Sequence, residues 1–179
     1  MSARAYGATA KSLHWLVFAL VAAQFVVAFS MPTIGRNTVP APLIDLHMSI
    51  GATILVVIVV RWMWRIGHPV PLAARDLPAW ERRVARTTHG LLYVLLAVDP
   101  LLGWANASAR DWKITLFGVV PLPHIVAPQA RAGQIAGDVH VIIAWVLLAL
   151  IGMHVTGALY HYFIRRDRIL QRMLPESGN

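Results

Sequence analysis

The chain has 179 residues, of which 58% are hydrophobic and only 13% are charged, and its formal net charge is +8. A soluble domain averages about 45–50% apolar and about 25% charged residues, so this composition indicates a membrane protein with the length of one domain. The absence of cysteine excludes disulfides, iron–sulfur ligation and thiolate metal sites.

Four apolar stretches follow one another along the chain, at residues 12–31, 43–64, 89–107 and 139–164. A bilayer core takes about 20 residues of helix. The sequence therefore predicts an all-α integral membrane four-helix bundle, with residues 1–179 forming a single membrane domain.

Two of these stretches have unusual features. The first follows a basic start, as a signal peptide does, but it is long and no clear small-residue cleavage site follows it, so we expect it to remain as a span. The third is interrupted by Asp99-Pro100, where a proline kinks a helix and frees a carbonyl. We expect Asp99 to cap this kink, with a functional acid as the alternative.

The basic residues are distributed unevenly between the two sides of a four-span protein. Twelve lie on the side of the termini and of the loop between the second and third stretches: Arg4, Lys11, Arg61, Arg65, Arg75, Arg82, Arg83, Arg86, Arg165, Arg166, Arg168 and Arg172. Four lie on the other side: Arg36, Arg110, Lys113 and Arg131. Because cytoplasmic loops carry the excess of Lys and Arg, both termini are predicted to be cytoplasmic. The charge then serves orientation and lipid contact, and nucleic-acid binding is not needed to explain it.

The loop between the third and fourth stretches is the longest connection, and it is amphipathic. It carries the apolar side chains Trp112, Leu116 and Phe117 among polar residues. We expect this loop to lie partly in the membrane interface.

Histidines lie within the apolar stretches at depths that match in pairs. A helix rises about 1.5 Å per residue at 3.6 residues per turn, so His140 and His154 lie about 21 Å apart on roughly one face. His14 begins the first stretch on the cytoplasmic side, and His47 begins the second on the outer side. The depths therefore pair His47 with His140 and His14 with His154, each pair from two different helices.

Facing imidazoles across a bundle core are the arrangement of two axial ligands of a haem iron. Two such pairs stacked across the membrane form an electron path. No C-x-x-C-H motif occurs, so such a haem is b-type and held non-covalently. Three alternatives remain open: hydrogen-bonded core or interfacial histidines, a zinc site, and a proton relay or transporter.

Four segments together are similar to a known family: "SLHWLVFALV", "DLHMSIGATILVVIVVRWMWR", "THGLLYVLLAVDPLLGW" and "GMHVTGALYHYFIRRDRILQRMLP". They resemble the bacterial cytochrome b561 family, from about Lys11 to Pro175. The resemblance implies a four-helix protein of the bacterial inner (cytoplasmic) membrane with two haem b groups and axial ligands at His14, His47, His140 and His154.

The resemblance also implies a superoxide oxidase activity, in which electrons pass from superoxide on the periplasmic side to ubiquinone in the membrane. Other four-helix cytochromes of this type are quinone-linked subunits of hydrogenases or formate dehydrogenases. The alternative function is therefore that of a haem b membrane subunit that links an unknown dehydrogenase to the quinone pool.

Four further residues are candidates for substrate contact. Superoxide is an anion that positive charge beside the outer haem would attract, so Lys113 and Arg131 are the predicted catalytic cations, with solvated loop charges as the alternative. Ubiquinone needs an apolar slot and polar groups at its carbonyls. His161 and His89 near the cytoplasmic end are predicted to bind it, with interfacial capping as the alternative.

The remaining polar residues and glycines have weaker assignments. Lys11, Arg61 and Arg65 are candidates to pair with haem propionates, although the orientation of the chain already explains them. His68 and His124 are expected in loops, with no assigned role. Three glycines either let a flat macrocycle approach the helix backbone or let helices pack closely: Gly51, Gly152 and Gly157.

Overall fold

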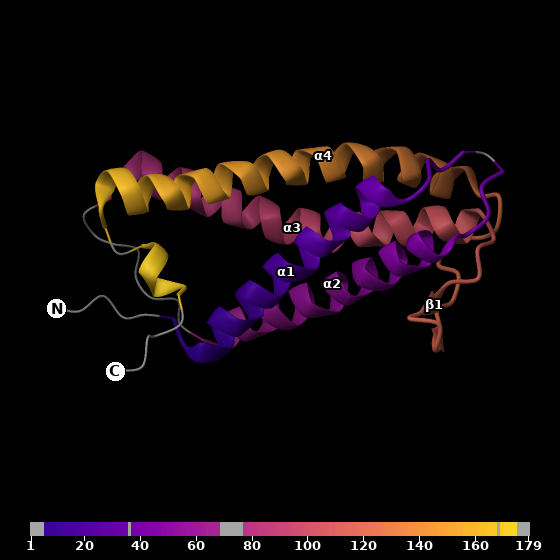
Figure 1. Ribbon diagram of the computed structural model, residues 1–179, viewed down its shortest axis with the longest axis horizontal. Helices are drawn as coiled ribbons and strands as arrows, with labels where there is room; N and C mark the ends of the chain where they lie inside the picture. The colour runs from indigo at the N-terminus through magenta and orange to yellow at the C-terminus, as the bar shows by residue number, and fades with distance from the viewer. Residues whose placement is uncertain (1–5, 36, 69–76, 168, 175–179) are drawn as a thin grey trace.

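The computed structural model describes residues 6–35, 37–68, 77–167 and 169–174. Four long helices run roughly along its long axis (Figure 1): α1 (Ala8–Ser30), α2 (Pro42–Gly67), α3 (Ala79–Ala109) and α4 (Arg131–Tyr160). Within the described part of the chain, these four are long and apolar enough to cross a membrane. This confirms the predicted all-α four-helix fold. Four cations used in the charge count lie outside the described residues: Arg4, Arg36, Arg75 and Arg168.

The helices extend beyond the apolar stretches at their polar ends. α2 begins with Pro42 at a position where its missing N–H costs nothing, and Asp45 in its first turn complements the helix dipole. α3 begins at Ala79, well before the predicted start, because its basic first turns are also helical. α3 also continues through Pro100 to Ala109, so the proline does not end this helix.

Neighbouring helices pack in chain order, α1 against α2, α2 against α3, and α3 against α4. The buried core between α1 and α2 consists of Val17, Val21, Ile50, Ile54 and Ile58. α1 and α4 meet through aromatic rings, His14 on His154 and Phe29 on Trp145. Many large apolar side chains on the outer faces are exposed, as expected for helices that lie in lipid.

One end of the bundle carries a short hairpin, β1 (Thr115–Leu116) and β2 (Val120–Pro121), which pair antiparallel. Phe117 and Gly118 both have positive φ, 49° and 74°, as tight hairpin turns require. A buried cluster supports this end: Ile44, Ala107, Trp112 and Ile114. The prediction that this loop lies in the interface is therefore wrong for Trp112, which is core, whereas Phe117 is exposed.

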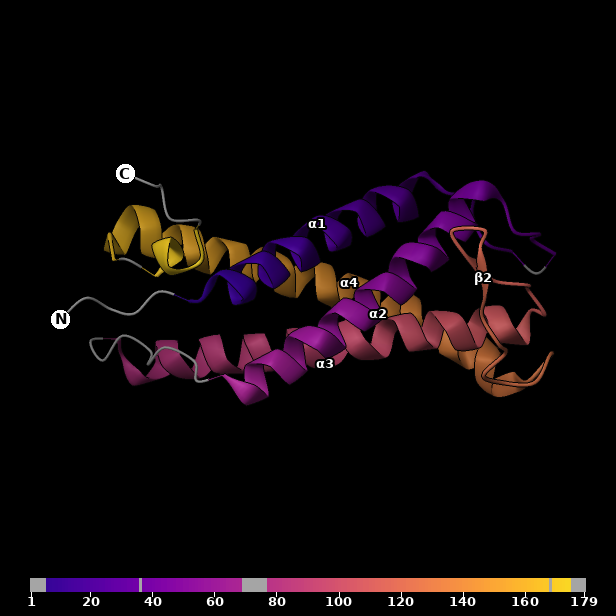
Figure 2. The same ribbon diagram turned by 90° about the horizontal axis from the view of Figure 1, so that it is seen from below.

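The opposite end carries the start of α1 and the segments that follow α4 (Figures 1 and 2). α4 continues into a π-helical turn, η1 (His161–Arg165), and the chain folds back through the 3-10 turn η2 (Leu170–Arg172). The Tyr6 backbone N–H donates to the carbonyl of Arg172 at 3.3 Å, which joins the two segments. We call this the termini end, and the other the hairpin end.

Candidate functional site

The hairpin end holds a pair of histidines from different helices. His47 lies in the second turn of α2 and His140 in the third turn of α4, and their ring centroids are 6.1 Å apart with planes inclined at 82°. His47 Nε2 lies 3.2 Å from the side-chain nitrogen of Gln24 on α1. Within the described residues, His47 Nδ1 is buried without a hydrogen-bond partner. An imidazole nitrogen in this situation fits a metal ligand, because a buried polar atom otherwise needs a hydrogen bond.

Asp99 of α3 orients the second ring of this pair. His140 Nδ1 lies 3.1 Å from the Asp99 carbonyl, so an N–H there donates to this carbonyl. The carboxylate oxygen Oδ1 lies 3.0 Å from the same nitrogen but has no hydrogen-bond partner among the described residues. This leaves Nε2 of His140 as the nitrogen for a metal, in the carboxylate–histidine arrangement common around metal ligands. The prediction that Asp99 caps a kink is wrong, since the carboxylate faces the neighbouring helix. The sequence feature that could have predicted the contact of Asp99 with His140 is an acidic residue in the outer half of a span, at the same depth as His140.

A glycine of α3 lets this ring lie close to the helix backbone. A Cβ added at Gly103 would lie 3.3 Å from Cε1 of His140, a tight contact. By contrast, a Cβ at Gly152 or Gly157 would meet no described atom within 4 Å. The described part of the structure therefore gives no support to close helix packing at Gly152 and Gly157.

The termini end holds three histidines in contact. His14 of α1 and His154 of α4 have ring centroids 6.2 Å apart, with planes at 74°. His89 of α3 lies closer to His154, with a centroid distance of 5.1 Å, and its Nδ1 lies 2.7 Å from the carbonyl of Ala85. The structure thus places His89 against the predicted His14–His154 pair.

Two arginines of α2 lie beside these three histidines. Arg61 Nε donates to the hydroxyl of Tyr93 at 2.8 Å, and the Arg61 and Arg65 guanidinium carbons lie 5.6 and 5.5 Å from the Tyr93 ring centre. The charge of Arg61 acts on His14, His89 and His154. Within the described residues, neither arginine forms an ion pair with a carboxylate, so the site is electropositive. Lys11, the third predicted cation here, is buried near the start of α1.

The spacing of both pairs fits a haem held from two sides. With metal–nitrogen bonds of about 2 Å, and about 1.1 Å from nitrogen to ring centre, two opposed imidazoles place their centroids about 6 Å apart. The two pairs, at 6.2 and 6.1 Å, match this value, whereas 5.1 Å for His89 and His154 does not. In the described residues, no group of three or more His, Cys, Asp or Glu could hold a zinc ion.

The predicted superoxide-attracting cations belong to two different segments at the hairpin end. Lys113 is exposed in the loop that precedes β1, and Arg131 is the exposed first residue of α4. A third cation of this end, Arg110, is engaged: it donates to the Gly35 carbonyl and lies over the Trp112 ring.

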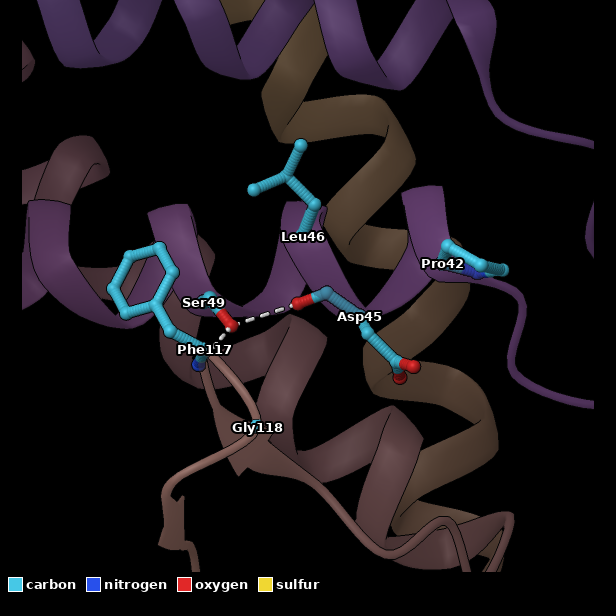
Figure 3. Close-up of a pocket in the computed structure, with 6 residues that line it drawn as sticks. All are labelled: Pro42, Asp45, Leu46, Ser49, Phe117 and Gly118. Carbon is cyan, nitrogen blue, oxygen red and sulfur yellow. Dashed lines mark hydrogen bonds between the residues drawn. The ribbon is translucent and has the colours of Figure 1, made fainter.

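Ser49, two residues after His47 on α2, fixes the hairpin to this helix. Figure 3 shows Ser49 beside Phe117 of the hairpin. The Ser49 hydroxyl donates to the Asp45 carbonyl at 2.8 Å and accepts the Phe117 backbone N–H at 2.9 Å. A pocket of about 300 Å³ lies around this tether, lined by Pro42, Asp45, Leu46, Ser49, Phe117 and Gly118. The loop that carries Lys113 is therefore held beside the helix that carries His47.

Of the other histidines, two lie at helix ends and one lies in a loop. His161 begins η1, and its Nδ1 lies 2.6 Å from a carboxylate oxygen of Asp167. His68 stacks on Trp64 at the end of α2, with centroids 3.7 Å apart. His124 lies in the long loop, 3.7 Å from Asp111 and within hydrogen-bonding distance of the Trp112 carbonyl.

Comparison with known proteins matches nearly the whole chain. The family model described as prokaryotic cytochrome b561 covers residues 5–176. The chain is 32% identical to cytochrome b561 homolog 2 of Escherichia coli K12, over 97% of this chain and 93% of that protein. It is 26% identical to a probable superoxide oxidase CybB of Yersinia pestis, over 92% and 93% of the two chains. It is 29% identical to cytochrome b562 of Cereibacter sphaeroides, over 91% and 90%.

Proposed function

Since this chain belongs to the prokaryotic cytochrome b561 family of haem b membrane electron-transfer proteins, we propose that it is a superoxide:ubiquinone oxidoreductase with two haem b groups. In this proposal single electrons enter from superoxide at the hairpin end and leave to ubiquinone at the termini end. The similarity to a probable superoxide oxidase supports the substrate.

The observation that carries the proposal is the presence of two facing imidazole pairs at two depths of one bundle. His47 and His140 would hold one haem, and His14 and His154 the other. When bound, haem b supplies one-electron redox chemistry. Asp99 orients His140. Arg61 and Arg65, which form no ion pair with a carboxylate among the described residues, suit the carboxylates of propionate groups at the termini end.

The hairpin end suits entry of a small anion. Lys113 and Arg131 are exposed there and would attract superoxide toward the His47–His140 haem. The excess of Lys and Arg on the other side of the bundle supports an orientation in which the hairpin end is periplasmic and both termini are cytoplasmic.

The termini end suits a membrane quinone. His161 is followed by the exposed apolar side chains Phe163 and Ile164, so its surroundings are accessible from lipid. His89 lies against the His14–His154 pair, and either imidazole can hydrogen-bond a quinone carbonyl.

Haem content is the first test. We expect purified protein to give a bis-histidine haem b spectrum and two haems per chain by pyridine haemochrome. A colourless preparation from haem-replete cells would refute the proposal. A proton or metal transporter would then be the better hypothesis.

The second test separates superoxide oxidation from electron transfer for a dehydrogenase. Superoxide is pulsed onto the oxidised protein with ubiquinone present, and haem reduction is followed. We expect the rate to fall about tenfold or more in a Lys113→Glu, Arg131→Glu variant, since steering changes on-rates by about 10- to 1000-fold. An Arg83→Glu, Arg86→Glu variant changes the charge equally at the other end and should keep the rate. No reduction in any variant, with stoichiometric copurification of a soluble redox subunit, would favour the alternative function.

A further inference from the structure

A carboxylate–imidazole pair lies where α4 ends. His161 Nδ1 and Asp167 Oδ2 are 2.6 Å apart, and the two side chains are only 16% and 27% exposed. Because an N–H at Nδ1 donates to the carboxylate, the other ring nitrogen, Nε2, remains for a ligand. The pair therefore resembles the orienting half of a catalytic dyad, in which an acid fixes a histidine and stabilises its charged form.

The His161–Asp167 pair spans the point where the chain reverses its direction after α4. Arg166 has a positive φ of 52°, and the Asp167 backbone N–H donates to the carbonyl of His161 at 3.2 Å. The second carboxylate oxygen, Oδ1, accepts the Ile169 backbone N–H at 3.1 Å. One oxygen of Asp167 thus holds the turn, and the other holds the imidazole.

A second helix connects to this pair through an arginine. Arg165 Nη1 lies 3.0 Å from Oε1 of Glu81 in the first turn of α3, and Arg165 Nε lies 3.8 Å from Asp167 Oδ2. The Glu81 side chain is only 7% exposed. The charged groups around His161 are therefore Asp167 directly, Arg165 beside Asp167, and Glu81 behind Arg165, while the Tyr160 ring lies against the imidazole.

We propose that Asp167 is a positioning residue for proton delivery to quinone, fixing the His161 ring through Nδ1 so that Nε2 can donate to a quinone carbonyl. This inference rests on the proposed function, since it requires quinone to bind at His161. The form of the ring that donates from Nε2 while its Nδ1 is bonded to Asp167 is the imidazolium. That imidazolium has N–H on both nitrogens, one for Asp167 and one for the quinone.

One quinone takes up two electrons and two protons to become a quinol, and two superoxide anions each lose one electron to become dioxygen. Each proton leaves Nε2 for a quinone oxygen, and the neutral imidazole keeps its Nδ1–H on Asp167. The partly exposed pair then takes a new proton from water on its side of the membrane.

The test compares Asp167→Asn with the native protein in two assays, haem reduction by superoxide and quinol formation. Asparagine keeps an oxygen for the Ile169 N–H but removes the negative charge. We expect kcat for quinol formation to fall about 10- to 100-fold, as loss of an orienting partner does, with KM for quinone and the rate of haem reduction unchanged. Asp167→Glu should recover part of kcat.

Three comparisons decide the outcome. Asp111→Asn removes a carboxylate near a histidine at the other end and should leave both assays unchanged. If His161→Gln lowers quinol formation and Asp167→Asn does not, the positioning role is refuted and the quinone site stands. If His161→Gln has no effect, the quinone site itself is refuted. A loss of haem reduction in Asp167→Asn would show that Asp167 serves only the fold.

Discussion

In the proposed two-haem arrangement, the carboxylate of Asp99 should lower the reduction potential of the haem held at the hairpin end. Its oxygen lies 3.0 Å from Nδ1 of His140. Adding about 2 Å across the ring and about 2 Å for a metal bond puts the charge about 7 Å from a metal on Nε2. At an effective dielectric constant of about 20, the attraction to one unit of charge is about 2 kcal/mol, or about 100 mV for one electron. Because this attraction favours the oxidised iron, Asp99→Asn should raise the midpoint potential by about this amount.

A spectroelectrochemical redox titration in detergent or nanodiscs measures this shift. Ligation should survive in Asp99→Asn, because the backbone carbonyl of residue 99 still accepts the His140 N–H. Asp111→Asn is the matched control, since its carboxylate lies at the same end but is 71% exposed and therefore screened by water. An unchanged or lowered midpoint, or a shift confined to the other haem, would show that Asp99 does not act on a metal held by His140.

Three further substitutions test other parts of the site. His14→Ala should halve the haem content and leave the spectrum of the hairpin-end haem unchanged, whereas His68→Ala should change neither. Full haem content in His14→Ala would disprove the assignment of His14 as a haem ligand. Gly103→Val should distort or expel the hairpin-end haem, because even a Cβ at this position would lie 3.3 Å from the His140 ring. Overpacking of this kind costs about 1–3 kcal/mol. A native haem spectrum would show that this contact is unimportant. Ser49→Ala removes the hydroxyl that accepts the hairpin N–H, so we expect the free energy of unfolding to fall by about 1 kcal/mol and the melting temperature by about 2–4 °C. The melting temperature is measured from haem absorbance on heating. An unchanged melting curve would argue that the hairpin is held by its apolar contacts alone.

Depth along the membrane could be predicted from the sequence, because helix rise is nearly constant. The direction of each span and a rise of about 1.5 Å per residue were enough to pair His14 with His154 and His47 with His140. The structure brings both pairs of rings into contact. The helical class of the fold followed in the same way from four long apolar stretches.

Rotation about each helix axis could not be predicted in this way. Asp99 and His140 share a depth, but only the packing of α3 on α4 turns them toward each other. The contact of His89 with His154 has the same origin. Trp112 was misplaced for a related reason, since the burial of a loop residue depends on which helix ends enclose it.

The fixed charges around the two histidine sites differ in sign, and this difference bears on the direction of electron flow. In the proposed two-haem arrangement, a carboxylate beside His140 would favour oxidised iron and lower the potential of that haem. At the termini end, Arg61 lies within electrostatic range of His14 and His154 and has no carboxylate partner among the described residues, so its charge would favour reduced iron and raise the potential of the haem there. Electrons would then move toward the higher potential, from the hairpin end to the termini end. Two propionate groups bound at Arg61 and Arg65 would cancel the positive charge at this end, and the bias would then come from the Asp99 carboxylate at the hairpin end. The same redox titration resolves the order: the haem that shifts in Asp99→Asn should be the one with the lower midpoint in the native protein.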